Sequence, residues 1–276
     1  MKIIASIPSY KEALFLDYCI KAIYDFVDEI ILTNTAMAAS IEAGYDFLSG
    51  DGTEEIIESW IAKPKIHVLT SKNKPNTFRE LMQPALDLAK KLDGDWLFTV
   101  GADEIWPKSS LMPLRNYLKL CDKQGILGLN AWMYIFAPDF WHHKDFRNPR
   151  LAKITKDCKL VHGDAMHWPE LGVYQFAGDT NVSIPLGTPD KVAKVNSDYP
   201  RQFRAFHYSC VGEERVNFKS KFYKSFDGTN CDKYVEAYLR EDWGAFAKLG
   251  YKEFTGKHPD VMMCHQLLND RKIKVG

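Results

Sequence analysis

Two adjacent carboxylates, Asp103 and Glu104, directly follow an apolar run, Asp95–Val100, that predicts a β-strand. The end of a strand is where an α/β sheet presents side chains to a ligand. A carboxylate pair at such a position suits a hard divalent cation that is bound together with substrate phosphates. The same two residues could instead only begin the turn that precedes Pro107, and position alone leaves both interpretations open.

The elements that must position these carboxylates alternate along the chain. Short apolar runs predict strands at Ile3–Ile7, Glu29–Thr33, Lys65–Leu69 and Asp95–Val100. Apolar residues at helical spacing predict helices over 15–26, 54–62 and 78–92, the last opened by a Thr77-x-x-Glu80 capping box. A helix around 110–121 and a strand around 127–136 follow.

This alternation predicts an α/β fold, because strands that are apolar throughout belong to a mainly parallel sheet covered on both faces. Ligands of such sheets bind at the carboxyl ends of the strands. The segments of interest are therefore Pro8–Glu12, Thr33–Gly52, Thr70–Asn76 and Gly101–Trp106.

The second half of the chain has a different texture. From Ala137 to about Pro200 it is rich in Pro, Gly, Trp and His, which predicts short strands and no helix. Helical spacing returns after Glu213 and over 233–249. No repeat or linker divides the 276 residues, so we expect a single domain.

Several motifs carry a resemblance to a known family. The segment Asp95-Trp-Leu-Phe-Thr-Val-Gly-Ala-Asp-Glu-Ile105 resembles the Asp-x-Asp segment of glycosyltransferase family 2-like enzymes with the GT-A fold. Upstream, Ile7-Pro-Ser-Tyr-Lys-Glu12, Asp51-Gly-Thr-Glu-Glu55 and Thr77-Phe-Arg79 resemble the family's nucleotide-contacting turn, its D-G-T-x-E loop and the start of its third helix. Downstream, similar stretches are Arg147–Leu151 with His162 or His167, and Ala205-Phe-His-Tyr208 followed by Glu214 and Lys221-Phe-Tyr223. Six partial motifs in family order over about residues 1–225 are more specific than any one of them.

The resemblance implies a GT-A-type sheet in which residues 1–136 bind a nucleotide sugar and residues 137–276 form the acceptor side and C-terminal helices. It implies transfer of a sugar from a nucleoside-diphosphate donor, of uridine type, to an acceptor hydroxyl, assisted by Mn²⁺ or Mg²⁺. The implied metal ligands are Asp103, Glu104 and His207. The implied nucleotide-sugar contacts are Pro8, Tyr10, Glu12, Asp51, Arg79, Ala102, Arg150 and Lys221.

One departure from the family pattern concerns the first acidic position of the Asp-x-Asp motif, which is Gly101 in this chain. The change removes one carboxylate from the metal and ribose contacts and puts metal dependence in question. The developing charge of a leaving diphosphate must still be stabilised by metal or cationic side chains. The cationic candidates are Arg79, Arg150, Lys219 and Lys221.

Transfer with inversion also needs a general base that deprotonates the acceptor hydroxyl. The candidates are Asp164, His167, Glu170 and Glu213, of which we favour the first three, in the 163–170 loop. The alternative is that the histidines of this loop pack on Trp168. Glu12 has an alternative too, because Ser9-x-x-Glu12 matches a capping box for the first helix.

Composition and charge indicate which partners and which cellular location to expect. Lys plus Arg and Asp plus Glu number 36 each, so no overall field draws the protein to nucleic acid or an anionic membrane. A basic run over 144–159 is the local exception, and it motivates modified DNA as an acceptor beside a glycan or small molecule. The six cysteines form no C-x-x-C pair and no apolar stretch of about 18 residues occurs, which predicts free thiols and a cytoplasmic protein without a transmembrane segment. A binding protein that keeps the fold without turnover is the third alternative.

Overall fold

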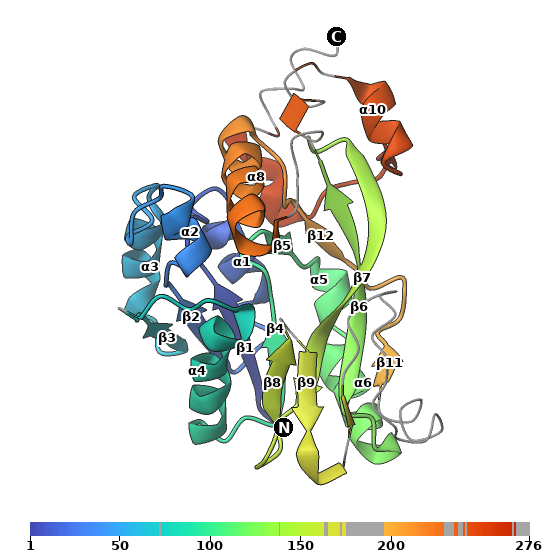
Figure 1. The fold of residues 1–276 in the computed structure, drawn as a ribbon. Helices are drawn as coiled ribbons and strands as arrows, with labels where there is room; N and C mark the ends of the chain where they lie inside the picture. The colour runs from blue at the N-terminus through green and yellow to red at the C-terminus, as the bar shows by residue number, and fades with distance from the viewer. Residues whose placement is uncertain are drawn as a thin grey trace.

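The structure is a computed structural model that describes residues 1–71, 73–137, 139–162, 165–171, 173–174, 196–228, 235–236, 240, 242–266 and 268. Its first half alternates strands with helices (Figure 1). The strands are β1 (Ile3–Pro8), β2 (Glu29–Thr33), β3 (Ile66–Leu69), β4 (Trp96–Thr99) and β5 (Glu104–Ile105). The helices are α1 (Leu16–Ile23), α2 (Ala38–Glu42), α3 (Thr53–Ile61), α4 (Phe78–Lys91), α5 (Lys108–Leu111) and α6 (Leu114–Gln124).

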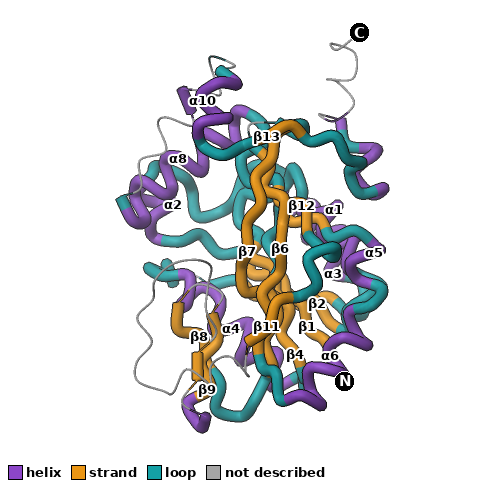
Figure 2. The backbone as a smooth tube through the Cα atoms, turned by 90° about the vertical axis from the view of Figure 1, so that its right-hand side faces the viewer, coloured by secondary structure: helices purple, strands orange, loops and turns teal. Residues whose placement is uncertain are grey.

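The second half is built on a long antiparallel pair, β6 (Gly128–Phe136) and β7 (His142–Lys153), which lie side by side in Figure 2. Smaller strands follow, namely β8 (Lys159–His162), β9 (Ala165–Trp168), β10 (Val173–Tyr174), β11 (Asn196–Asp198), β12 (Ala205–His207) and β13 (Lys252–Glu253). The helices of this half are η1 (Pro169–Leu171), α8 (Glu213–Asp227), α10 (Trp243–Lys248) and η2 (Asp260–Cys264).

Within the described residues the main sheet has the strand order β3-β2-β1-β4-β7-β6-β12-β5. The first four strands are parallel, with Ser6 opposite Thr99 and Pro8 opposite Thr33. β7 enters antiparallel to β4, and β12 is parallel to β6 and antiparallel to β5. The predicted fold class is confirmed in its parallel first half, while the second half is mixed.

The parallel strands are covered on both faces because their residues alternate between two cores. Ile3, Ala5 and Ile7 of β1 pack in one hydrophobic cluster with α1 and α6, and Ile4 packs in another with α4. This double burial explains why these strands are mostly apolar. It also holds the carboxyl ends of β1, β2 and β4 at one edge, as the sequence predicts.

Some local predictions need correction. The predicted helix at 110–121 is two helices, α5 and α6, separated at Met112 and Pro113, since proline cannot donate the backbone bond that a continuous helix needs. The twelve-residue strand β7 was not predicted beyond short strands in this region, because Pro149 and five charged residues conceal its strand pattern. Of the predicted helix at 233–249, the structure describes the part that forms α10, and residues 229–234, 237–239 and 241 lie outside the described residues.

Other expectations agree with the structure. Thr77 caps α4 by accepting the Glu80 N–H at 3.1 Å. The described cysteines, Cys19, Cys121, Cys158, Cys210 and Cys264, are free thiols. None of the helices in the described part of the chain has the length and apolar character needed to span a lipid bilayer.

Candidate functional site

The loops after β1, β2 and β4 meet at one edge of the sheet. The Val100 N–H donates to Ser6 O at 3.0 Å and the Ser9 N–H donates to Thr33 O at 3.0 Å, which fixes the starts of the loops after β4 and β1. Lys11 adopts a left-handed backbone at φ 55°, so the chain reverses and Glu12 faces the sheet edge. The described carboxyl ends therefore form one site, as parallel strands require.

A cavity of about 130 Å³ opens at this edge, which we call the edge slot. Helix α8 closes it with Phe218, Lys219, Phe222 and Tyr223. The remaining lining residues are Pro8, Tyr10, Glu12, Thr33, Thr35, Met37, Ser40, Phe78, Leu81, Gly101, Ala102 and Asp103. Five residues predicted as contacts or ligands, Pro8, Tyr10, Glu12, Ala102 and Asp103, are thus brought together.

The carboxylates of the edge slot are held by Arg215 of α8. Nη1 and Nη2 of Arg215 lie 2.6 and 3.0 Å from the two oxygens of Glu12, and Nη2 also donates to Asp103 Oδ2. Lys219 lies one turn further along α8, with Nζ 3.6 Å from Asp103 Oδ2 and 3.9 Å from Glu12 Oε1. All four side chains are at most 17% exposed, so these charges interact with little solvent screening.

The two carboxylates respond differently to this environment. Burial alone would raise the pKa of Asp103, but His207, Lys219 and Arg215 together hold it well below its usual range. Burial raises the pKa of Glu12 and outweighs the lowering by Arg215. Asp103 is therefore the more firmly ionised of the pair.

His207 reaches Asp103 from β12. Because β12 is antiparallel to β5, His207 lies opposite Glu104 in the sheet, and its Nε2 is 3.2 Å from Asp103 Oδ1. Its other ring nitrogen, Nδ1, is buried without a hydrogen-bond partner among the described residues. The predicted neighbours Asp103 and His207 are thus in contact.

Glu104, the third predicted metal ligand, points to a different partner. Arg150 of β7 donates from Nε to both Glu104 oxygens, at 3.1 and 2.9 Å, and from Nη2 to Oε1. Both side chains are buried, Glu104 at 1% exposure and Arg150 at 5%. Arg150, predicted to contact the donor, is engaged with Glu104 and lies outside the edge slot.

The other predicted contacts lie at or beyond the rim. Asp51 accepts from the Thr53 N–H at 3.1 Å and its hydroxyl at 2.6 Å, at the start of α3. It also lines a second cavity of about 730 Å³ on the far side of Phe218, together with Lys11, Glu213, Glu214 and Arg215. Arg79 and Lys221 are exposed and do not line the edge slot.

Two of the predicted general bases, His167 and Glu170, are not brought to this site. His167 lies on β9, in a small sheet that packs on α4, and Glu170 Oε1 accepts from Thr155 at 2.5 Å. Thr155 follows Lys153, which pairs with Trp96 at the amino end of β4, whereas Asp103 follows the carboxyl end. Asp164 lies outside the described residues. The packing alternative fits Trp168, which is fully buried and donates to Lys153 O at 2.8 Å.

Two further expectations can be compared with the structure. Glu12 is not a helix cap: its side chain faces Arg215, and the Ser9 hydroxyl is buried without a partner among the described residues. The basic run at 144–159 does not form one surface, since Arg150 is buried against Glu104 and Lys153 lies 3.0 Å from Asp122. Much of its positive charge is therefore already balanced.

Arg215 is the residue that sequence reasoning missed. It precedes Phe218 by three residues, Lys219 by four and Phe222 by seven, so all four share one helical face. The apolar members of that face were recognised in the sequence, and their spacing could have indicated Arg215. Its carboxylate partners, far away in the chain, could not be read from that spacing.

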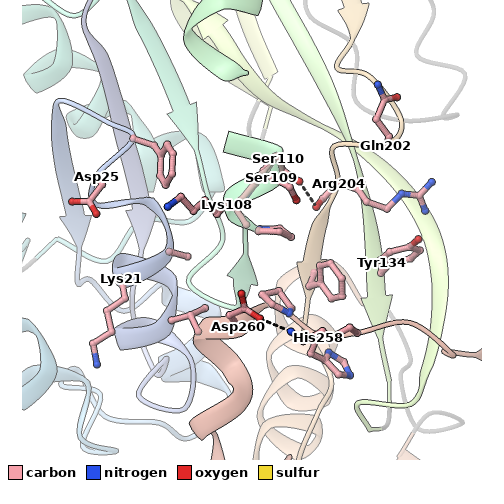
Figure 3. Close-up of a pocket in the computed structure, with 18 of the residues that line it drawn as sticks. Lys21, Asp25, Lys108, Ser109, Ser110, Tyr134, Gln202, Arg204, His258 and Asp260 are labelled. Atoms are coloured by element: carbon pink, nitrogen blue, oxygen red, sulfur yellow. Dashed lines mark hydrogen bonds and ion pairs between the residues drawn. The ribbon is translucent and has the colours of Figure 1, made fainter. Parts of the chain in front are cut away.

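A third cavity, of about 1010 Å³, lies beside β5 and β12 (Figure 3). Phe206 lines it, whereas the adjacent His207 faces Asp103 on the other side of the strand. Four of its cations are paired with carboxylates, for example Lys257 with Asp260 at 2.8 Å and Arg204 with Asp145. No residue predicted as part of the site lines this cavity.

The strand order, the carboxylate segment after β4 and the β5–β12 pair decide the fold type. It is a mixed α/β sheet whose first half is parallel. The edge slot lies at the carboxyl ends of these parallel strands, which is where ligands of such sheets bind.

Comparison with known proteins gives likenesses of fold alone. No family model matches the chain, and no curated protein matches its sequence. The structure of S. aureus TarS 1–349 is 12% identical, with a TM-score of 0.45, over 88% of this chain and 72% of that chain. Another S. aureus TarS structure is 16% identical, with a TM-score of 0.34, over 49% of this chain and 21% of that chain, so the match spans about a fifth of its length. A cytidylyltransferase from Leptospira borgpetersenii is 19% identical, with a TM-score of 0.32, over 47% and 52%.

Proposed function

We propose that this protein transfers a sugar from a nucleoside-diphosphate donor, of uridine type, to an acceptor hydroxyl. The observation that carries the proposal is the edge slot, an apolar cavity at the carboxyl ends of the parallel strands that is lined by Lys219 and by Asp103, the partner of Arg215. Such edges are where α/β sheets bind nucleotides. The acceptor class, whether glycan, small molecule or modified DNA, is left open by this site.

The volumes of the edge slot and of the 730 Å³ cavity suit a donor whose base and sugar occupy different cavities. Drug-sized ligands occupy roughly 300–1,000 Å³, so the 130 Å³ edge slot takes a nucleobase and not a whole donor. Aromatic rings border the slot, with Tyr10 and Phe218 at a centroid distance of 6.2 Å, and they offer stacking surfaces to the base. Phe218 also lines the 730 Å³ cavity, which offers room for the sugar.

The diphosphate would then lie between the two cavities, next to Arg215 and Lys219. In the transfer, the bond between the anomeric carbon and the diphosphate oxygen breaks and its electron pair stays on that oxygen. The two cations stabilise this charge in a site that excludes water. The acceptor oxygen forms the new bond to the anomeric carbon and gives its proton to a base.

Glu213 is the general base that this arrangement favours. It was one of the candidates by residue type, and its exposed carboxylate lines the 730 Å³ cavity, which Arg215 also lines. Glu214 lines the same cavity and is the alternative on the same turn of α8. His167 and Glu170, which lie toward the amino end of β4, would have to act on an acceptor that extends to that end.

Thermal unfolding with a panel of nucleoside diphosphates, each in EDTA and in Mn²⁺, tests the proposal. A ligand at about 100 times its dissociation constant adds about 2.7 kcal/mol of stability, which raises the midpoint of a chain this long by roughly 5 to 10 °C. We expect the largest shift with uridine diphosphate and a smaller one with uridine. The absence of a shift with every nucleotide in both buffers would contradict the proposal.

Replacement of Asp103 distinguishes an enzyme from a binding protein of the same fold. In an enzyme, Asp103→Ala should lower donor hydrolysis and transfer by two orders of magnitude or more, because Asp103 holds Arg215 and Lys219 in position. A wild-type protein that binds the nucleotide but never consumes the donor sugar would support the non-catalytic alternative.

A further inference from the structure

The carboxylates expected to hold a divalent cation are already bound by arginine side chains. Arg150 contacts both oxygens of Glu104, and Arg215 contacts Asp103 and Glu12. Among the residues that the structure describes, no group of three or more His, Cys, Asp or Glu side chains is arranged to hold a metal ion. The donor set that the resemblance implies therefore does not fit a divalent cation.

The glycine in the Asp-x-Asp segment belongs to the same arrangement. A Cβ atom at Gly101 would lie 2.8 Å from Asp103 Oδ1 and 3.0 Å from Glu104 Oε1, closer than real Cβ contacts allow. The carboxylates of Asp103 and Glu104 thus pack into the space that an aspartate at 101 would need. The glycine at 101 and the pairing of Asp103 and Glu104 with arginines therefore occur together in this loop.

Lys219 is the cation of this cluster that is least engaged. Its Nζ approaches Asp103 and Glu12 at 3.6 and 3.9 Å, which is beyond hydrogen-bond distance. Lys219 also lines the edge slot, whereas Arg215 does not. Its ammonium can therefore turn to a ligand oxygen at little cost to the ion pairs already formed.

The acids keep this buried cation charged. Burial of an isolated ammonium disfavours its charged form, but the carboxylates of Asp103 and Glu12 lie 3.6 and 3.9 Å from Lys219 Nζ and favour the charged form. Within the cluster, Arg215 and Lys219 offset the two negative charges of Glu12 and Asp103. The cluster is therefore balanced before a diphosphate enters, and the cation available to a diphosphate oxygen is Lys219, whose ammonium makes no hydrogen bond to the two acids.

We infer that Lys219 and Arg215 receive the diphosphate of the nucleotide directly, so that nucleotide binding needs no divalent cation. Asp103 and Glu12 act as positioning residues, which hold the two cations at the end of the edge slot. The inference rests on the proposed function, because it concerns the same site and the same class of ligand.

Calorimetric titration of the full chain with uridine diphosphate tests the inference, in EDTA and in Mn²⁺. We expect dissociation constants that agree within about threefold, which corresponds to less than about 0.7 kcal/mol. Binding only in Mn²⁺, or binding more than tenfold tighter in Mn²⁺, would overturn the inference and leave the proposed function standing. Binding in neither buffer, to this or any other nucleoside diphosphate, would contradict the proposed function itself.

Variants of Lys219 provide a second test of the inference. Lys219→Met should weaken binding in EDTA at least tenfold, and Lys219→Arg should stay within about threefold of the wild type because it keeps the charge. The affinity of Lys219→Met should also depend less on salt concentration, which a merely structural role of Lys219 would not change. Lys224→Met, an exposed position on the same helix, is the matched control.

Wild-type affinity in the Lys219→Met variant would overturn the assignment of Lys219. If that variant does not fold, the comparison of EDTA with Mn²⁺ on the wild-type chain still decides whether a cation is needed.

Discussion

The guanidinium of Arg215 donates to the carboxylate of Asp103, although the two residues are 112 positions apart in the chain. This contact ties α8 to the carboxyl end of β4. It also connects two segments that the resemblance assigns to separate halves of the protein. Glu12, at the carboxyl end of β1, completes the connection.

Removal of Arg215 should destabilise the fold. Arg215→Met leaves Glu12 and Asp103 buried together without their main counter-charge, and breaking a buried pair in this way costs about 3–5 kcal/mol. The free energy of unfolding at pH 7, measured in urea, should fall by that amount. Lys224→Met should change it by less than about 0.5 kcal/mol, since exposed positions contribute little. A loss below about 1 kcal/mol in Arg215→Met would show that the pair is not formed.

The pair of Glu104 and Arg150 predicts a non-additive double variant. Glu104→Gln leaves the Arg150 charge buried and should lower the free energy of unfolding by about 3–5 kcal/mol, whereas Glu104→Leu combined with Arg150→Met should recover most of the loss. Chemical denaturation of Glu104→Leu, Arg150→Met and the double variant in EDTA measures the coupling. If Glu104 were a metal ligand without a protein partner, its replacement in EDTA would change the stability little.

Restoring the family's aspartate should harm this protein. Gly101→Asp places a Cβ within 3.0 Å of the carboxyl oxygens of Asp103 and Glu104 and adds a third negative charge beside them. We expect a lower melting temperature in EDTA, and Gly101→Ala should show the steric part alone, about 1–3 kcal/mol. Differential scanning calorimetry of both variants checks whether Gly101→Asp melts below Gly101→Ala and whether both melt below the wild type. If either variant were as stable as the wild type, the loop would have room for a side chain at position 101, and the steric argument would be contradicted.

Acid should loosen the loop beside the second cavity through Glu54. Burial raises the pKa of Glu54, but hydrogen bonds outweigh this and lower it below its ordinary value of 4.5, chiefly from the Ser49 N–H at 2.8 Å and from the Asn34 side chain. A carboxyl group with a lowered folded-state pKa contributes stability above the pKa of the unfolded chain, and this is lost as pH falls through the folded-state pKa.

Comparison of the wild type with Glu54→Gln measures that contribution. The difference in unfolding free energy should be constant from about pH 5.5 to 8, where both the folded and unfolded carboxyl groups are ionised, and should shrink below about pH 4.5. A difference that does not change with pH would rule out the ionised carboxylate as the acceptor.

Local sequence patterns were sufficient for the parallel half of the sheet. The bounds of β2 were predicted to the residue, because its apolar centre, Ile30–Leu32, is buried and lies between the polar residues Glu29 and Thr33. β7 escaped prediction because its polar residues have partners elsewhere in the fold, as Arg150 has in Glu104. A strand whose charges are paired by other strands carries no alternation that a single sequence can reveal.

By itself, the sequence determined that helices and strands alternate, that the strands form a sheet covered on both faces, and that Pro8, Glu12 and Asp103 lie at its carboxyl edge. These features follow from the periodicity of burial, which is local. Only the tertiary structure decided which partner each charge has: Arg215 for Glu12 and Asp103, and Arg150 for Glu104. Ion pairs between distant residues depend on the path of the whole chain, since any of the 36 basic side chains could serve any carboxylate until the fold brings two of them together.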